Sequence, residues 1–403
     1  MIRKTHMRTL YKLELEKLFR RLSALICLAL LLAYGIVTYD EWVDPFGKGL
    51  YLMDEDGTIR HGRDAIRLER EWMEPYRGVL TDAHVEEISQ ESYRHAKQQA
   101  TYLQQMIESG TQLNEMDMPY AERVMIHFFL TEEVSLREYT ENGRTVEDSI
   151  SISLDTPRQI GEIFPDSALP LRLEYSPPWS GMMESMIVLL FLLNLVVLLV
   201  ISPVFSEEHT RQMNALLFTS KLGKRKCFRA KIAAAYSIGI FFVLTIILTH
   251  MLITFLFFGG DGLAGSIQIS GEYLFYGDFP YAKTVGSAIF DAALLYTADV
   301  LFAVSLTVLG SVLASNVLSG MVISLALWMA PIVLAVIDAV PRQVKMIAPV
   351  IHKTDLNALL RLPDVTLGSI TIRYSHAASG VLVLLSVLIA LCAAWTYRHV
   401  TGE

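Results

Sequence analysis

The sequence predicts an all-α polytopic membrane protein with six transmembrane helices and a mainly helical extracytoplasmic domain, with a minor β element, between the first two helices. Apolar residues make up 52% of the 403 residues and charged residues only 19%, below the roughly 25% of ordinary globular chains. Six apolar segments each approach the roughly 20 residues that cross a bilayer as a helix. This composition excludes an ordinary soluble enzyme.

The charges are segregated along the chain. Residues 40–180 hold 28 acidic and 13 basic residues, a net charge of -15, whereas 1–21 and 205–231 each hold 7 basic and 2 acidic residues. Such asymmetry is typical of membrane topology and does not indicate a nucleic-acid partner. The predicted order is a cytoplasmic N-terminus 1–21, span 22–39, extracytoplasmic domain 40–180, span 182–204, cytoplasmic segment 205–231, spans 232–258, 290–314 and 317–338, external loop 339–376 and span 377–396.

The fourth and fifth spans are separated only by Ser315 and Asn316. They form either a tight hairpin or one long broken segment, and we favour the hairpin because the combined run is too long for one crossing. If these spans did not both cross, segment 339–376 would move inside, and its five basic residues would then follow the general bias of cytoplasmic loops.

Basic residues next to the spans set the orientation, because they resist translocation. Both termini are therefore expected to be cytoplasmic, with 259–284 as a short external loop. A secretory signal peptide is the alternative interpretation of the N-terminal segment, but 21 residues are long for its basic region. Cys27 and Cys392 lie in predicted spans and Cys227 in the inner loop, so no disulfide framework is expected outside.

The domain 40–180 is long enough to form a small core. We expect a helix capped by Asp82 that ends before Gly110, and a second helix after Pro119. The alternation of Ile150, Ile152 and Leu154 with serines predicts a strand. The acidic charge is explained by a solvated surface, and a dock for cationic peptides is the functional alternative.

The sequence lacks the common motifs of catalysis. It contains no G-x-x-x-x-G-K-[ST] phosphate loop, H-E-x-x-H, C-x-x-C or G-x-S-x-G, and its histidines show no ligand spacing. We therefore expect no enzyme activity, no cofactor and no metal on this chain.

The segment 205–231 predicts a short amphipathic helix at the inner membrane surface. Ser206 is the expected N-cap, Glu207 and Glu208 suit the positive end of the helix dipole, and Gly223 is expected to end the helix. One face carries Phe205, His209, Gln212, Met213, Leu216 and Leu217. Without further information, this is an interfacial helix that caps the bundle and contacts lipid headgroups.

This segment resembles the permease subunits of the ABC-2 class of ABC transporters. In that family, a cytoplasmic stretch of the form Phe-x-x-Glu, a gap, Leu-Leu-x-Thr-Ser, a Gly or Pro with Arg, and a Lys precedes the third span. The matching positions are Phe205, Glu208, Leu216, Leu217, Thr219, Ser220, Gly223, Arg225 and Lys231. Gln212 and Met213 replace the Gly-Thr that often precedes the leucines. Six spans, cytoplasmic termini, an insert after the first span and a tight connection between the fourth and fifth spans also resemble this family, whereas the insert 40–180 itself resembles no domain that can be named.

The resemblance implies that this chain forms a path across the bacterial cytoplasmic (plasma) membrane. A separate ABC ATPase subunit would bind ATP and Mg²⁺, and a second permease chain, identical or a sister chain, would complete the complex. Met213, Leu216 and Leu217 would then anchor a coupling helix in a groove of the ATPase. Export of a peptide, drug or lipid-like substrate is the expected activity. The alternative is a membrane-anchored sensor or resistance receptor that signals to a cytoplasmic partner without transport.

Polar residues within the spans are candidates for the translocation path. An acid at mid-span costs about 2.5–3.5 kcal/mol on insertion scales, and Asp299 lies eight residues beyond Asp291, or about 12 Å deeper. Asp299 is expected either to line the path or protonate within it, or to form a hydrogen bond with a hydroxyl on a neighbouring helix. Asp291 is expected to be solvated at the headgroups. Asn194 and His250 are further candidates, or they join helices through hydrogen bonds.

Overall fold

The protein, studied as a computed structural model, folds into two compact units. The first comprises Met1–Thr38, Met183–Ile253 and Ile289–Glu403, and the second comprises Tyr39–Met182 and Thr254–Ala288. The structure describes residues 2–20, 22–42, 44, 46, 49–109, 117, 119–129, 135–141, 144–151, 157–210, 223–270, 282–336, 365–367 and 370–400.

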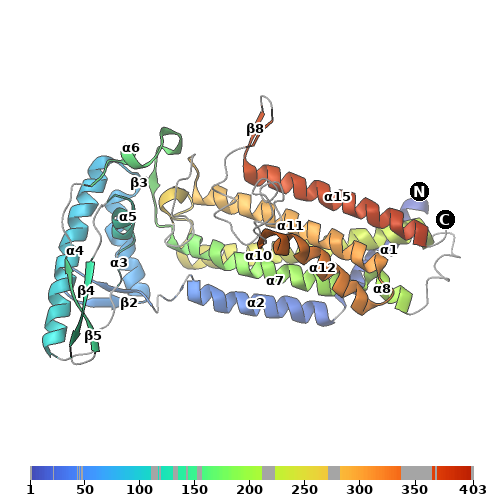
Figure 1. The fold of residues 1–403 in the computed structure, drawn as a ribbon, viewed down its shortest axis with the longest axis horizontal. Coiled ribbons are helices and arrows are strands. Elements are labelled where there is room, and N and C mark those ends of the chain that lie inside the picture. The colour runs from blue at the N-terminus through green and yellow to red at the C-terminus, as the bar shows by residue number, and fades with distance from the viewer. Residues whose placement is uncertain are drawn as a thin grey trace. The chain divides into compact units, whose positions relative to one another are not determined.

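Helices form almost all of the described part of the first unit. Figure 1 shows its long helices running side by side. They are α1 (Ile2–Phe19), α2 (Leu22–Trp42), α7 (Pro177–Ile201), α8 (Pro203–Thr210), α10 (Phe228–Phe258), α11 (Val285–Leu313), α12 (Val317–Val336) and α15 (Tyr374–Val400), with a π-helical turn at Gly223–Cys227 and a hairpin of β7 (Val365–Leu367) and β8 (Ile370–Ile372). By this division, the last residues of α2 and α10 and the first residues of α7 and α11 are counted in the second unit.

Four helical segments within the described residues are long and apolar enough to cross a membrane. They are Pro177–Glu208, Arg225–Phe258, Val285–Leu313 and Tyr374–His399. A fifth results if Met7–Phe19 and Ala24–Tyr39, which meet at 57°, form one broken span. The first part of α12, Val317–Ala330, is a shorter apolar helix and is not one of these candidates. The structure thus confirms a mainly helical chain with four helices, or five, that could span a membrane, but it does not confirm six spans.

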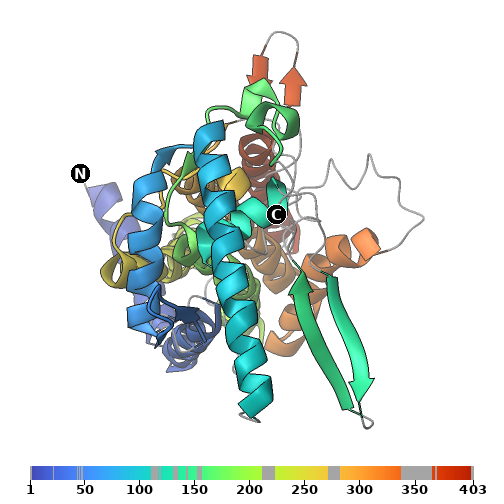
Figure 2. The ribbon, with the colours of Figure 1, turned by 90° about the vertical axis from the view of Figure 1, so that its left-hand side faces the viewer.

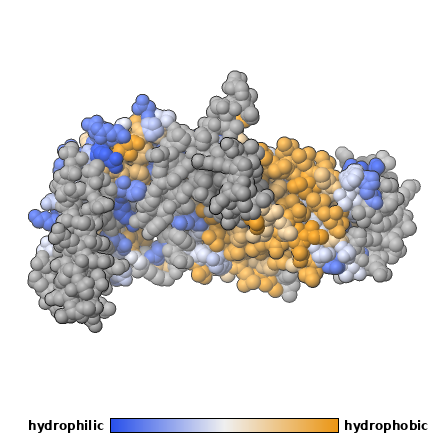
Figure 3. All heavy atoms as spheres, in the orientation of Figure 1, coloured by the Kyte–Doolittle hydropathy of each residue, from blue (hydrophilic) through white to orange (hydrophobic). Residues whose placement is uncertain are grey.

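The outer surface of the spanning helices is apolar. Figure 3 shows this surface as a broad hydrophobic region. Leu252, Leu318 and Leu391 are 57%, 70% and 60% exposed. A protein surface in water rarely exposes so many neighbouring apolar side chains. A lipid environment accounts for this exposure.

Small residues allow the helices of the first unit to pack closely. A Cβ at Gly239 of α10 would lie 2.8 Å from Val304 of α11, and one at Gly310 of α11 would lie 2.3 Å from the hydroxyl of Ser324 on α12. In membranes, where the hydrophobic effect does not drive helix association, close packing of this kind supplies much of the attraction.

The second unit combines helices with three two-stranded antiparallel sheets among its described residues. Its larger helices are α3 (Arg63–Met73), α4 (Asp82–Ser109) and α5 (Tyr120–Phe128), and α6 (Ile160–Ile163) is one turn long. The strand pairs are β1 (Tyr51–Met53) with β2 (Ile59–His61), β3 (Gly78–Val79) with β6 (Arg172–Leu173), and β4 (Ser135–Glu141) with β5 (Arg144–Ser151). Figure 2 shows α3 beside α4, and the long β4–β5 hairpin.

Both helices expected in this region are confirmed. α4 ends just before Gly110, and α5 begins directly after Pro119. The expected cap is wrong, because the Thr81 hydroxyl accepts the amide of His84, while the Asp82 carboxylate accepts the amide of Ile160. The expected strand is confirmed through Ser151, and Ile152 and Leu154 lie outside the described residues.

A buried carboxylate organises the centre of the second unit. Glu69 of α3 is 3% exposed and accepts hydrogen bonds from the Tyr120 amide and the Tyr175 hydroxyl, both at 2.8 Å. Arg123 lies 3.5 Å from the same side chain. Because a buried charge is costly unless it is paired and hydrogen-bonded, these partners hold α3 against the start of α5.

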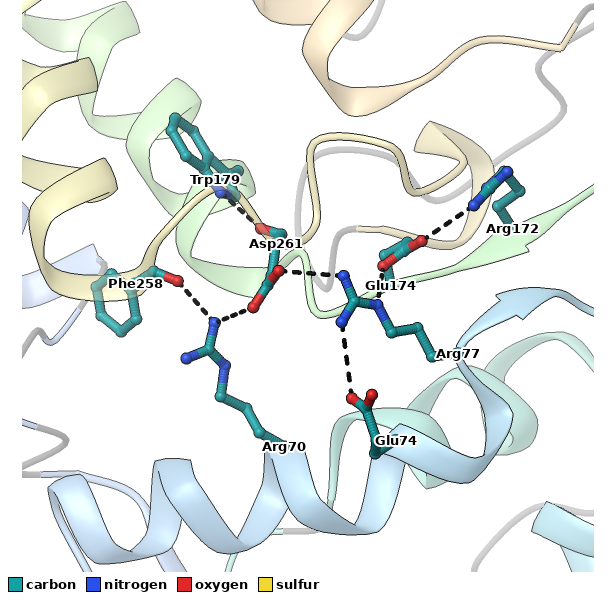
Figure 4. A network of polar contacts seen from close by, with 8 residues as sticks. All are labelled: Arg70, Glu74, Arg77, Arg172, Glu174, Trp179, Phe258 and Asp261. Carbon is teal, nitrogen blue, oxygen red and sulfur yellow. Dashed lines mark hydrogen bonds and ion pairs between the residues drawn. The ribbon is translucent and has the colours of Figure 1, made fainter.

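Arginines join the segment after α10 to α3, as Figure 4 shows. Arg70 donates to the Phe258 carbonyl at 2.6 Å and to Asp261 at 3.1 Å, and Arg77 bridges Asp261 and Glu174. The Trp179 indole donates to the Asp261 carbonyl. Residues 254–288 belong to the second unit, whereas the sequence predicted the end of a span through 258 and a short external loop at 259–284.

Candidate functional site

Residues 205–231, the motif segment, begin next to a break between two helices. α7 ends at Ile201 and α8 begins at Pro203, whose ring lacks an N–H and interrupts the helical hydrogen bonds. The hydroxyl of Ser311, from α11, accepts the amides of Phe205 at 3.0 Å and Ser206 at 3.1 Å and donates to the Ser202 carbonyl at 2.5 Å. A side chain of another helix thus caps α8.

Three residues of the motif lie together next to this break. The Lys231 side chain is fully buried, and its ammonium donates to the Val204 carbonyl at 2.6 Å and lies 2.5 Å from Glu208. The same ammonium sits 5.1 Å from the centre of the Phe205 ring, within the range of a cation–π attraction. α8 is thereby fastened to the first turn of α10.

Aromatic packing extends this cluster to the end of the chain. Phe205 lies 5.2 Å from Phe228 and 5.4 Å from Tyr397, measured between ring centres, and Phe228 stacks on Tyr397 at 4.9 Å. Pairs at these separations add about 0.5–1.5 kcal/mol beyond the area that they bury. α8 is therefore held by α10, α11 and α15.

The N-terminal helix approaches the same cluster. Lys17 lies 3.7 Å from Glu207, and the hydroxyls of Tyr11 and Ser237 are 2.8 Å apart. These contacts place α1 against α8 and α10.

Glu14, Glu208 and Cys227 each offer one potential metal-ligand atom, and the three atoms lie within 4.8 Å of one another. The Lys231 ammonium already lies 2.5 Å from Glu208 and provides the positive charge that a metal would supply there. We therefore interpret this group as an ion-pair cluster.

The structure changes two local expectations for the motif. Ser206 is not an N-cap, because it lies inside α8 and its hydroxyl donates to the Ser202 carbonyl at 2.8 Å. Gly223 begins a π-helical turn that leads into α10, and Arg225 in this turn is exposed. The expected anchors Met213, Leu216 and Leu217, with Gln212 and Thr219, lie outside the described residues.

Two of the three candidates for the translocation path are in contact. The Asn194 amide of α7 donates to Asp299 of α11 at 2.7 Å, and both residues are at least 96% buried. His250 of α10 lies elsewhere, with its Nδ1 2.9 Å from the Ile246 carbonyl. A Cβ at Gly35 of α2 would meet the His250 ring at 2.9 Å, so this histidine packs tightly between helices.

The expectation for Asp291 is wrong. This residue is only 2% exposed and accepts a hydrogen bond from the Ser375 hydroxyl at 3.1 Å, with His376 Nε2 at 3.0 Å and Arg373 at 3.9 Å. Because α11 begins at Val285, five residues before the predicted start, Asp291 lies inside the helix and faces the N-terminus of α15. That helix end favours a negative charge.

The sequence did not identify Ser311, Phe228 or Tyr397 as parts of the motif cluster. Hydroxyl and aromatic side chains are common in apolar helices, and their partners here lie between 23 and 192 residues away along the chain. The one available signal was Pro203, since a proline at a helix break frees backbone groups that need a partner.

No protein-family model matches the chain, and a search of curated proteins finds no relative of it. The specific part of the family resemblance is therefore the segment 205–231 alone.

Proposed function

We propose that this chain is the membrane-spanning permease subunit of an ABC transporter of the ABC-2 class, which exports a peptide, drug or lipid-like substrate while a separate ATPase subunit hydrolyses ATP. It works in the bacterial cytoplasmic membrane with both termini inside, and it pairs with a second permease chain. ATP and Mg²⁺ bind to the ATPase.

The observation that carries this proposal is the contact among Phe205, Glu208 and Lys231. The family motif relates these positions by sequence alone, and in the folded chain Lys231 touches both of the others. An interfacial helix that only lay on lipid headgroups would need no buried ion pair, because a desolvated pair is expensive and adds little stability. The cluster is explained if α8 must move together with α10.

The surroundings of α8 suit a coupling element. Its start is capped by Ser311 of α11, its middle is tied to Lys231 of α10, and its Phe205 ring packs on Tyr397 of α15. A displacement of α8 by a closing ATPase would therefore act on three helices. Coupling of this kind requires packed contacts that shift as a unit.

The Asn194–Asp299 pair is the proposed polar contact along the path. It links α7, which leads directly into the motif segment, with α11, which caps α8 through Ser311. Ionisable groups inside a membrane are expensive to insert and are commonly functional. We assign Asp299 to the path on this ground, and Asn194 as the residue that orients it.

The decisive experiment is to purify the chain in mild detergent from its native cells and to identify the proteins that accompany it. The test variant carries Leu216→Asp and Leu217→Asp, which would place two charges on the apolar face of the coupling segment. The control is Leu13→Asp, which introduces a charge at an exposed position of α1. We expect a stoichiometric ATPase with a phosphate loop to accompany the wild type and the control.

Loss of the ATPase from the double variant alone would support both the transporter class and the coupling role of the segment. If no ATPase accompanies the wild type even after gentle crosslinking, the permease proposal is wrong, and a receptor that signals to another partner becomes the better explanation. If the double variant retains the ATPase, the coupling role of Leu216 and Leu217 is wrong.

A further inference from the structure

A pocket of about 350 Å³ lies between α10 and α15 in the first unit. Three arginines line it, namely Arg225, Arg229 and Arg398. The remaining lining residues are aromatic or aliphatic, and none carries a carboxylate: Phe228, Ile232, Tyr236, Val387, Ala390, Leu391, Ala394 and Tyr397. The pocket is therefore an apolar groove with positively charged side chains at its rim.

The helical repeat explains how these residues come together. Arg225 lies in the π-helical turn that leads into α10, and Arg229, Ile232 and Tyr236 of α10 continue the same face at intervals of three and four residues. On α15 the order is reversed, from Val387 through Ala394 to Arg398. The small side chains of Ala390 and Ala394 leave room between the helices. The groove extends about 16 Å along α15 from Val387 to Arg398.

The position of the arginines matches the depth of lipid headgroups. Arg225 is the first residue of one candidate span, and Arg398 is the second-to-last residue of another, Tyr374–His399. Both ends therefore lie at the same face of the membrane. Arginine side chains at such ends reach the interface, while the apolar part of the groove continues toward the hydrocarbon core.

We propose that this groove binds one anionic phospholipid, with the phosphate on Arg225, Arg229 and Arg398 and an acyl chain along Ala390, Ala394 and Ile232. A guanidinium binds phosphate oxygens through two parallel hydrogen bonds. Basic pockets between membrane helices are typical sites for such headgroups. The headgroup of a zwitterionic lipid also carries a positive charge, which would lie next to three arginines and be repelled. The site therefore selects lipids with a net negative charge.

Phe228 and Tyr397 line the groove and also pack on Phe205. A bound lipid thus stabilises the aromatic cluster that holds α8. The binding itself does not depend on the permease assignment, since it involves only α15, α10 and the π-helical turn before α10.

The test is native mass spectrometry of the full chain in detergent, titrated with phosphatidylglycerol or with phosphatidylcholine of the same acyl composition. The first variant carries Arg225→Gln, Arg229→Gln and Arg398→Gln. Its control removes three positive charges elsewhere near the N-terminus, through Arg8→Gln, Lys12→Gln and Arg20→Gln. A second variant, Ala390→Phe, fills the groove and keeps all three arginines. Elution volume and melting temperature confirm that each variant folds.

We expect the wild type and the control to retain phosphatidylglycerol about tenfold more strongly than phosphatidylcholine. The triple variant should lose this preference, and Ala390→Phe should reduce retention of phosphatidylglycerol. Addition of phosphatidylglycerol should raise the melting temperature of the wild type and leave that of the triple variant unchanged.

Equal retention of both lipids by the wild type would overturn the proposal, as would full retention of phosphatidylglycerol by the triple variant. If the chain dimerises when lipid is removed and Ala390→Phe prevents this dimer, the groove binds a second copy of the chain. This outcome would also overturn the proposal.

Discussion

The ammonium of Lys231 lies 2.5 Å from the carboxylate of Glu208, and the lysine side chain is fully buried. The two residues are 23 positions apart, on either side of a basic segment, and their contact ties α8 to α10. A buried ion pair contributes little net stability compared with a well-packed apolar pair, but breaking it leaves one charge without a partner. Removing one partner should therefore cost more stability than removing both, which can be tested.

We expect Lys231→Met and Glu208→Gln each to destabilise the protein by about 3–5 kcal/mol, and the double variant to be more stable than Lys231→Met alone. Melting temperature in detergent measures this. The matched control is the Lys17–Glu207 pair, whose lysine is 41% exposed. Exposed pairs are worth about 1 kcal/mol or less, so Lys17→Met should have a small effect. Additive effects of the two buried changes would argue against a direct pairing.

Ser311 caps α8 from a different helix, which predicts a sharp effect of removing one hydroxyl. Ser311→Ala leaves the amides of Phe205 and Ser206 without this acceptor, and we expect a loss of about 1–3 kcal/mol. The control is Thr245→Ala, which removes a hydroxyl that donates to a carbonyl of its own helix. Thermal unfolding should separate the two variants, and an equal, small change in both would show that another group caps α8.

Asp299→Asn should slow ATP hydrolysis by the complex reconstituted in liposomes, without preventing assembly. The amide keeps the shape of the side chain but weakens the hydrogen bond from Asn194, because bonds to a charged group are worth about 1.5–3 kcal/mol and neutral ones about 1. Asp291→Asn, at the contact with α15, is the comparison. An unchanged rate in Asp299→Asn would remove Asp299 from the proposed path.

The second unit should become less stable as the pH rises through the folded-state pKa of His95, which lies above 6.5. His95 of α4 is hydrogen-bonded to Glu122 of α5, and this bond raises the pKa of the imidazole above its ordinary 6.5. Stability from a raised histidine pKa is complete below the unfolded value and is lost as the pH rises through the folded value. The imidazole stacks on Trp72 at 4.8 Å between ring centres, so tryptophan fluorescence can follow the titration.

His95→Gln should abolish the fluorescence change above pH 6.5 and flatten the dependence of melting temperature on pH in the same range. Glu122→Gln should shift the titration of His95 to lower pH, because the partner charge is lost. A wild-type titration midpoint at or below 6.5 would contradict the expected direction.

Gly310→Ala should destabilise the packing of α11 against α12. The added Cβ would lie 2.3 Å from the Ser324 hydroxyl and 3.0 Å from its backbone nitrogen, and overpacking of this kind costs about 1–3 kcal/mol. Gly380→Ala is the control, since its Cβ would contact nothing within 4 Å, and alanine favours a helix over glycine by about 1 kcal/mol. The two melting temperatures should therefore move in opposite directions.

The sequence by itself predicted the helical membrane class and the two main helices of the second unit, because apolar length and local capping signals lie in short stretches of chain. Asp82 to Ser109 and the start after Pro119 are examples. The ends of the spans were predicted less accurately. α11 begins at Val285, whereas 290 was predicted, because a run of apolar residues does not show where the first turn of the helix begins.

The tertiary structure alone decided which polar residues meet. Lys231 could have been one more member of a basic loop, and Asp291 could have been solvated, as expected from its place in the sequence. Their burial and their partners Glu208 and Ser375 depend on how α8, α10, α11 and α15 pack. Partners of buried charges are chosen by three-dimensional proximity, which composition and periodicity do not encode.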